Sequence, residues 1–154
     1  MARNSQVLAF AVASECMAAV FVAEGKLKEW KMWRRAVEDT TIARSKFRIM
    51  VAKLSPDLIL IEDPWTNTKK SGQSLAVLQT LAQAAEDEPV RHALLERIQR
   101  YENRYDEAQA LTERFPQIRA WCPKPPKSFE TESRHLVYFE ALSYVAEALD
   151  AADN

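Results

Sequence analysis

Glycine is scarce in this sequence: the 154 residues include only Gly25 and Gly72. Loops that cradle phosphates in P-loop and dinucleotide-binding proteins need several glycines at fixed spacing, so neither class fits. The nucleophile turn of α/β-hydrolases, with a glycine on each side of the catalytic serine, is absent as well. Three large groups of enzymes are therefore excluded.

Cysteine and histidine are equally sparse, with two of each, and no cluster of them has the spacing of a zinc site. We interpret Cys16 and Cys122 as reduced, buried or half-buried thiols of a cytoplasmic protein, with a disulfide between them as the alternative. His135 falls within an apolar helical stripe, so we expect a core or boundary histidine, with a metal ligand as the other interpretation.

The chain has no excess of either charge, because 21 basic side chains face 22 acidic ones and the formal net charge is -1. Nonspecific nucleic-acid binding usually requires a basic excess, so the overall charge gives it no support, although the charges could be segregated on one face. The apolar content of 47% and charged content of 28% are typical of a globular protein. The length suits a single domain over residues 1–154.

Long apolar runs are also missing. The N-terminal 25 residues resemble a secretory signal, but Ser14 and Glu15 interrupt them. We therefore predict two strands, over residues 6–13 and 16–23, in preference to a signal. No other stretch is long enough to span a bilayer.

The apolar periodicity predicts a mixed α/β fold. Strands at 6–13, 16–23 and 26–33 are joined by short turns and should be antiparallel, whereas later strands follow helices and should run parallel to the first. After these strands we expect first a helix capped by Thr40 or Thr41 and stopped by Pro56, then a strand at 57–61 and a helix capped by Ser71. A helical insertion at about 86–116, a strand at 118–122 and a helix from about Thr131 complete the expected order. The result is a five-stranded mixed sheet flanked by helices.

The helical insertion carries a heptad-like apolar stripe between residues 94 and 115. This stripe could cover the sheet, or it could pair with a second copy of the chain. A homodimer is therefore one expected assembly.

Four segments carry a resemblance to a known family: QVLAFAVASECMAAVFVAEGKLKEWKMW, SPDLILIEDPW, SGQSLAVLQTLAQAAED and FEALSYVAEALD. In their order they resemble the ribonuclease H-like fold and, within it, the RuvC-type Holliday-junction resolvases. The resemblance covers most of the chain outside residues 86–115. It implies hydrolysis of phosphodiesters by two Mg ions, held by acids of the first strand, the fourth strand and the last helix.

Carried over position by position, the resemblance gives only part of that acidic set. Glu62 matches the glutamate that ends the fourth strand, and Glu140 matches the second acid of the last helix. Ala11 and Val137 stand where the other two acids are expected. The resemblance therefore implies a degenerate site in which Glu62 and Glu140 are catalytic remnants.

Two further acids lie close to these positions in sequence. Asp63 follows Glu62 but should point to the opposite face of its strand, and Glu15 lies beyond the end of the first strand. If the protein is active, we expect Glu62, Glu140 and Asp63, or Glu15 in place of Asp63, to hold Mg or Mn.

The leading hypothesis is a RuvC-like module that is catalytically degenerate and has a structural or nucleic-acid-interacting role. The alternative is a Mg- or Mn-dependent, structure-specific DNA endonuclease with a rearranged carboxylate site. Branched or single-stranded DNA is the expected partner in either case. The candidate contacts are Lys69, Lys70, Lys124 and Lys127 for phosphates and Trp65 for stacking on bases. The simpler interpretation of these lysines is that they are exposed loop residues.

Overall fold

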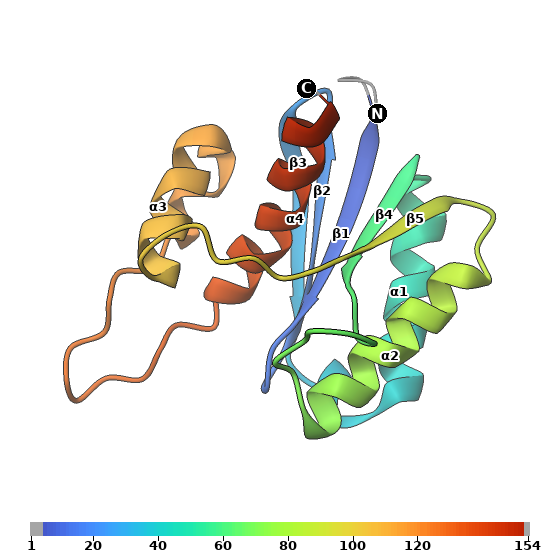
Figure 1. The fold of residues 1–154 in the computed structure, drawn as a ribbon, viewed down its shortest axis with the longest axis horizontal. Coiled ribbons are helices and arrows are strands. Elements are labelled where there is room, and N and C mark those ends of the chain that lie inside the picture. The colour runs from blue at the N-terminus through green and yellow to red at the C-terminus, as the bar shows by residue number, and fades with distance from the viewer. Residues whose placement is uncertain (1–4, 153–154) are drawn as a thin grey trace.

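The computed structural model describes residues 5–152, which form one mixed sheet with helices on both faces (Figure 1). The strands are β1 (Gln6–Val12), β2 (Met17–Ala23), β3 (Lys26–Trp33), β4 (Leu58–Glu62) and β5 (Arg91–Leu95). Their order across the sheet is β3-β2-β1-β4-β5. The first three strands pair antiparallel and β4 is parallel to β1, as predicted. β4 is also parallel to β5.

The turn between β2 and β3 consists of Glu24 and Gly25, between the paired residues Ala23 and Lys26. Both turn residues have positive φ, 57° at Glu24 and 77° at Gly25. A two-residue hairpin turn of this kind matches the right-handed twist of the strands, and glycine adopts positive φ with little strain. One of the two glycines is therefore used to fix the register of the hairpin.

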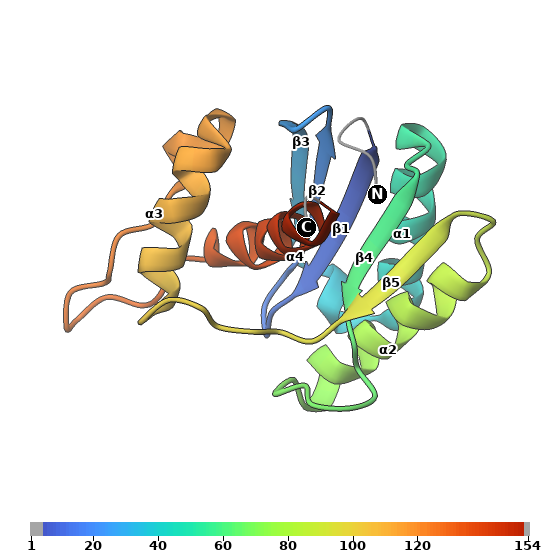
Figure 2. The ribbon, with the colours of Figure 1, turned by 45° about the horizontal axis from the view of Figure 1, so that its top comes forward.

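The helices form two layers. On one face of the sheet lie α1 (Thr40–Leu54) and α2 (Gly72–Glu86), together with the short 3₁₀ helix η1 (Ala36–Glu38). On the other face lie α4 (Leu136–Ala152), α3 (Arg104–Arg114) beside it, and the 3₁₀ helix η2 (Pro116–Trp121). Figures 1 and 2 show α4 crossing the sheet while α3 stands farther out.

Alternation along β1 assigns its side chains to the two layers. Leu8, Phe10 and Val12 pack against α1 and α2. Val7, Ala9 and Ala11 pack on the α4 side. Because two of these three are alanines, α4 lies close to the sheet at the site described below.

The structure corrects the predicted start of α1. Its N-cap is Asp39, whose carboxylate accepts a hydrogen bond from the Thr41 amide at 2.8 Å, so neither Thr40 nor Thr41 is the cap. The helix ends with Ser55 in the left-handed region, just before Pro56, as expected. Ser71 does precede α2, but its side chain makes no capping hydrogen bond.

The larger correction concerns residues 86–122. The predicted continuous helix with its stripe from 94 to 115 is wrong, because residues 91–95 form β5 and α3 begins only at Arg104. The predicted strand at 118–122 is also wrong, because Pro116–Trp121 is the 3₁₀ helix η2. The last helix begins at Leu136 and not near Thr131.

Other expectations at the N-terminus and the cysteines are confirmed. Residues 6–12 and 17–23 are strands, while the first four residues of the signal-like stretch lie outside the described part. Cys16 and Cys122 are free thiols. Among residues 5–152, no helix combines the length and apolar character needed to cross a bilayer.

Candidate functional site

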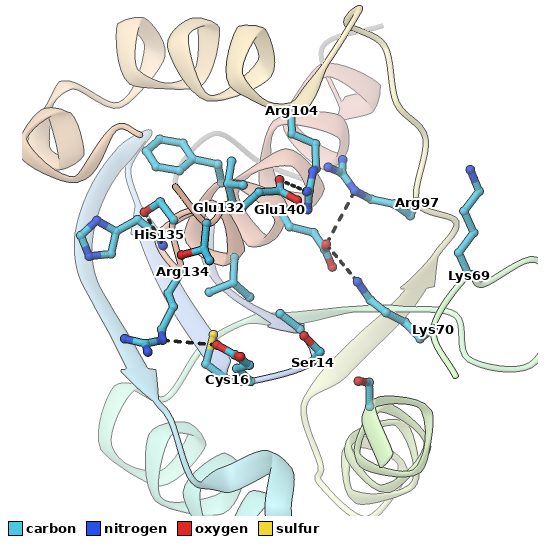
Figure 3. A pocket seen from close by; sticks show the side chains of 18 of the residues that line it. Ser14, Cys16, Lys69, Lys70, Arg97, Arg104, Glu132, Arg134, His135 and Glu140 are labelled. Carbon is cyan, nitrogen blue, oxygen red and sulfur yellow. Dashed lines mark hydrogen bonds and ion pairs between the residues drawn. The ribbon is translucent and has the colours of Figure 1, made fainter. Parts of the chain in front are cut away.

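An open hollow of about 1290 Å³ lies where β1, β4 and β5 end. These three strands are parallel, so their carboxyl ends share one edge of the sheet, the usual place for ligand sites in such sheets. The hollow is lined by the β1–β2 turn, the start of α2, the chain after β5, the segment 130–135 and the first turns of α4. Figure 3 shows side chains of both charges converging there.

Glu62 and Glu140, the two acids matched by resemblance, lie together. Glu62 ends β4 on the face that meets α4 and is only 2% exposed. The Tyr144 hydroxyl lies 2.9 Å from Glu140 Oε2 and 3.4 Å from Glu62 Oε1, so the phenol bridges the two carboxylates. Burial, and then the negative charges of Glu140 and Glu62, raise the pKa of Tyr144 well above its ordinary value. Tyr144 therefore stays a neutral donor.

Lys70 approaches the same pair of carboxylates. Its ammonium lies 3.1 Å from Glu140 Oε1 and 4.0 Å from Glu62 Oε1, and its side chain is 20% exposed. The contact between Lys70 and Glu140 is drawn in Figure 3, with the neighbouring Lys69 pointing away from it. The two adjacent lysines, equivalent in the sequence-based prediction, thus have different environments.

A second cation lies on the other side of Glu140. Arg97 binds Glu107 through two hydrogen bonds of 2.6 and 3.0 Å, and its Nε lies 3.9 Å from Glu140 Oε1. A further bond of 3.2 Å joins Arg97 to the Ser143 hydroxyl, which donates to the Glu140 carbonyl. Burial alone would lower the pKa of Arg97, but the hydrogen bonds and charge of Glu107 raise it on balance. The guanidinium is therefore permanently charged.

Sequence reasoning missed Arg97, Glu107 and Tyr144 as parts of this site. Glu107 is buried beside Ala108 on α3. Its position next to an apolar residue of the helical stripe was the one signal in the sequence that it is buried. Tyr144 lies among the buried residues of α4, where it is indistinguishable by pattern from a core aromatic. Arg97 follows β5, in a segment wrongly predicted to be helical.

The positions expected to hold the other two acids are apolar and buried. Ala11 is 1% exposed and Val137 is 3% exposed, and both belong to the core beneath α4. Ala9 pairs with Leu60, so the same register, two residues on, brings Ala11 beside Glu62. A methyl group therefore occupies the place next to this carboxylate.

The other acids near the hollow do not complete a metal site. Asp63 accepts hydrogen bonds from the Trp65 amide at 2.8 Å and the Thr66 hydroxyl at 3.0 Å, which fixes the turn after β4. Glu15 is paired with Arg134 at 3.5 Å. Within the described ranges, no three Asp, Glu, His or Cys side chains are grouped so that they could hold a metal ion. The donor set thus does not fit two Mg ions, which need several hard oxygen ligands and a shared carboxylate.

Of the remaining candidate residues, His135 lines the hollow, whereas Trp65, Lys124 and Lys127 do not. Trp65 is 53% exposed, and Lys124 and Lys127 are exposed on the connection that leads to α4 without lining the hollow. His135 is half-buried with its ring centroid 5.9 Å from that of Tyr138, in agreement with a boundary residue.

Cys16 lines the hollow, but its thiol is not activated as a nucleophile. Burial raises the pKa of its thiol from 9.0 to about 11, so it is neutral at physiological pH.

Similarity to known proteins is found at the level of structure. No protein-family model matches the sequence, and no curated protein matches it. Thermus thermophilus RuvC has a TM-score of 0.64 and 12% identity over 95% of this chain and 96% of that one. Fowlpox virus resolvase, solved with substrate Holliday junction DNA, has a TM-score of 0.57 and 12% identity, with coverage of 94% and 99%.

The yeast mitochondrial Holliday junction resolvase Ydc2 is similar too, with a TM-score of 0.53 and 11% identity, covering 97% of this chain and 84% of its own. At such identities the likeness shows a shared fold and nothing finer. The chain has the RuvC-like, ribonuclease H-like fold that the resemblance implied.

Proposed function

We propose that this chain is a catalytically degenerate RuvC-like module that binds branched or single-stranded DNA without cutting it. The observation that carries the proposal is the Lys70 ammonium, which lies against Glu140 and Glu62 where a resolvase would need divalent ions. Ala11 and Val137 leave no carboxylate to bridge two ions.

The pairing of the charged groups supports this proposal. Two cations, Lys70 and Arg97, contact the three carboxylates of Glu62, Glu140 and Glu107, and the Tyr144 hydroxyl donates a hydrogen bond to Glu140. In the described part of the chain, no buried side-chain nitrogen or oxygen lacks a hydrogen-bond partner. The carboxylates are thus stabilised by protein groups and do not depend on an added ion.

DNA as the ligand is supported by the comparisons and by the hollow. Resolvases of this fold have been solved with Holliday junction DNA. For this chain we assign a phosphate contact to the exposed Lys69 and base stacking to Trp65, whereas Lys124 and Lys127, which lie outside the hollow, are assigned only secondary contacts. Lys70 is engaged with Glu140, so its role is structural in this proposal.

The test is binding and cleavage with the same labelled substrates, a four-way junction and a single strand. We expect fluorescence anisotropy to show binding that persists in EDTA, without any requirement for Mg²⁺, and that weakens steeply as salt rises. Gel analysis should show no product with Mg²⁺ or Mn²⁺. Metal-dependent cleavage that disappears in Glu62→Gln but persists in the exposed control Glu38→Gln would contradict the proposal.

The convergence of Glu62 and Glu140 on Tyr144 favours a second candidate, a Mg- or Mn-dependent structure-specific endonuclease. This alternative needs Lys70 to leave and Asp63 or Glu15 to turn towards the hollow. Calorimetric titration with Mn²⁺ distinguishes the two functions. The nuclease predicts a binding signal lost in Glu62→Gln, whereas the degenerate module predicts none in the wild type.

A homodimer is the assembly we propose, because a four-way junction presents two equivalent strands to a two-fold symmetric protein. Light scattering after size exclusion should give twice the 17.6 kDa of one chain. A mass of one chain at micromolar concentration, with and without junction DNA, would refute the dimer and leave the DNA-binding proposal in place.

A further inference from the structure

A second hollow of about 570 Å³ lies next to the first. Its lining residues are Ser14, Glu15, Arg34, Arg35, Val37, Glu38 and Arg134. Three of them, Ser14, Glu15 and Arg134, also line the first hollow. The two hollows are therefore neighbours, separated only by the β1–β2 turn and the Arg134–Glu15 ion pair.

The topology makes these hollows follow one edge of the sheet. Two antiparallel steps separate β3 from β1, so β3 ends at the same edge as β1, β4 and β5. Arg34 and Arg35 directly follow the last residue of β3, Trp33, which pairs with Met17 at the start of β2. Four strand spacings of about 4.8 Å place the two ends of this edge roughly 19 Å apart.

Most cations along the edge are already neutralised. Lys70 and Arg97 bind Glu140 and Glu107 inside the first hollow, as described above. Arg104 pairs with Glu132, and Arg134 pairs with Glu15 at 3.5 Å (Figure 3).

Three cations along the edge have no ion-pair partner among residues 5–152. Within residues 5–152, no carboxylate lies within ion-pair distance of Arg34, Arg35 or Lys69, and all three side chains are exposed. Glu38 lines the same hollow as the two arginines, so that end keeps two such cations against one acid. Positive charge available to a ligand is thus found at the β3 end and at Lys69, on either side of the paired groups.

We infer that Arg34 and Arg35 bind phosphates of a nucleic-acid strand that lies along this edge of the sheet, with Lys69 contacting the same strand farther on. The inference rests on the proposed function and specifies the path of its DNA. In a duplex, one strand carries a phosphate about every 3.4 Å of helix axis, so roughly 19 Å of edge corresponds to about five or six phosphates of a strand whose axis follows it. Guanidinium groups suit this contact because they donate two parallel hydrogen bonds to phosphate oxygens.

The inference differs from what the sequence pattern alone suggests. Lys124 and Lys127 were the basic loop residues expected to meet DNA, yet they line neither hollow. Replacing either pair by glutamine removes the same formal charge from exposed positions. The two double variants therefore form a matched comparison of position at constant charge.

The experiment measures junction affinity from 50 to 200 mM salt for the wild type, Arg34→Gln/Arg35→Gln and Lys124→Gln/Lys127→Gln. We expect the arginine variant to lower the slope of log affinity against log salt by about two, with at least tenfold weaker binding at 50 mM. The lysine variant should change the slope by less than half as much. Arg34→Lys/Arg35→Lys should keep the slope, which separates charge from a folding defect.

The outcomes distinguish this inference from the function on which it rests. A wild type that binds no DNA overturns the proposed function and this inference together. A wild type that binds DNA, with an unchanged slope in the arginine variant, overturns the path along the β3 end and leaves DNA binding intact.

Discussion

The two faces of the sheet differ in what they bury, although the same strands form both. The α1 and α2 face is an apolar core in which Phe10 and Phe47 lie with ring centroids 4.8 Å apart. The α3 and α4 face is apolar at its centre but buries Glu62, Glu107 and Thr112, which are the buried polar residues of the described chain. Charge is therefore concentrated on one side and at one edge.

Because of this asymmetry, the interactions that stabilise the fold differ between the two faces. On the α1 and α2 face the stabilisation comes from buried apolar area and is non-directional. Substitutions there that keep the side-chain volume are therefore tolerated. On the α4 face each charged group depends on a specific partner, because an unpaired buried charge is costly. Substitutions on the two faces should therefore differ in kind, and four of them test this difference.

The largest effect is expected from Phe47→Ala on the apolar face. Removing this fully buried ring should lower the free energy of unfolding by about 4 kcal/mol through lost burial and a residual cavity. Urea denaturation followed by circular dichroism measures the loss. Ile49→Ala, on the same helix but more than half exposed, should cost less than about 0.5 kcal/mol, and equal losses would contradict this description of the core.

Arg97→Met should rank second, because it leaves Glu107 buried without its partner. We expect a loss of about 3 kcal/mol in the free energy of unfolding. The double variant Arg97→Met/Glu107→Leu should regain most of that stability, since an apolar pair can replace a buried ion pair. Additive losses in the double variant would show that the two charges do not act as a pair.

Lys70→Met and Lys69→Met form an internal comparison of two adjacent lysines. Lys70→Met removes a charged partner from Glu140 and should cost about 2 kcal/mol. Lys69→Met should stay within about 0.5 kcal/mol because that side chain is exposed. Chemical denaturation of both variants in parallel measures the two losses in the free energy of unfolding. Equal losses would mean that Lys70 is as solvent-exposed as Lys69.

Tyr144→Phe should have the smallest effect at neutral pH, about 1 kcal/mol, because it removes one hydroxyl from Glu62 and Glu140. The folded-state pKa of Tyr144 is raised, so above pH 10 the unfolded phenol ionises first and the wild type loses stability. The stability difference between wild type and variant should therefore narrow between pH 9 and 11. A difference that widens with pH would mean that the phenol ionises more easily in the folded protein.

The sequence predicted those strands that are marked by an apolar run or a turn residue within the segment itself. The hairpin follows from two apolar runs around Glu24–Gly25, and β4 follows from an apolar run buried on both faces. β5 could not be found this way, because none of its five residues is fully buried at the sheet edge and Leu94 also fits a helical spacing. It becomes a strand through its pairing with β4, a contact that no local pattern contains.

The candidate site divides in the same way. Glu62 and Glu140 were found from the resemblance, and the fold brings them together. The pairing of Arg97 with Glu107 joins residues that lie apart in the chain, and no local pattern shows that the two meet. Which of two adjacent lysines meets Glu140 depends on the direction of the chain as it enters α2.

The buried methyl group of Ala11 also limits which single substitutions the site tolerates. An aspartate introduced there alone would place an unpartnered anion beside Glu62, in a region where Lys70 is already shared with Glu140. A chain with this single substitution should thus be less stable than the present chain. An acid at this position is therefore expected only together with a second substitution that supplies a positive charge nearby.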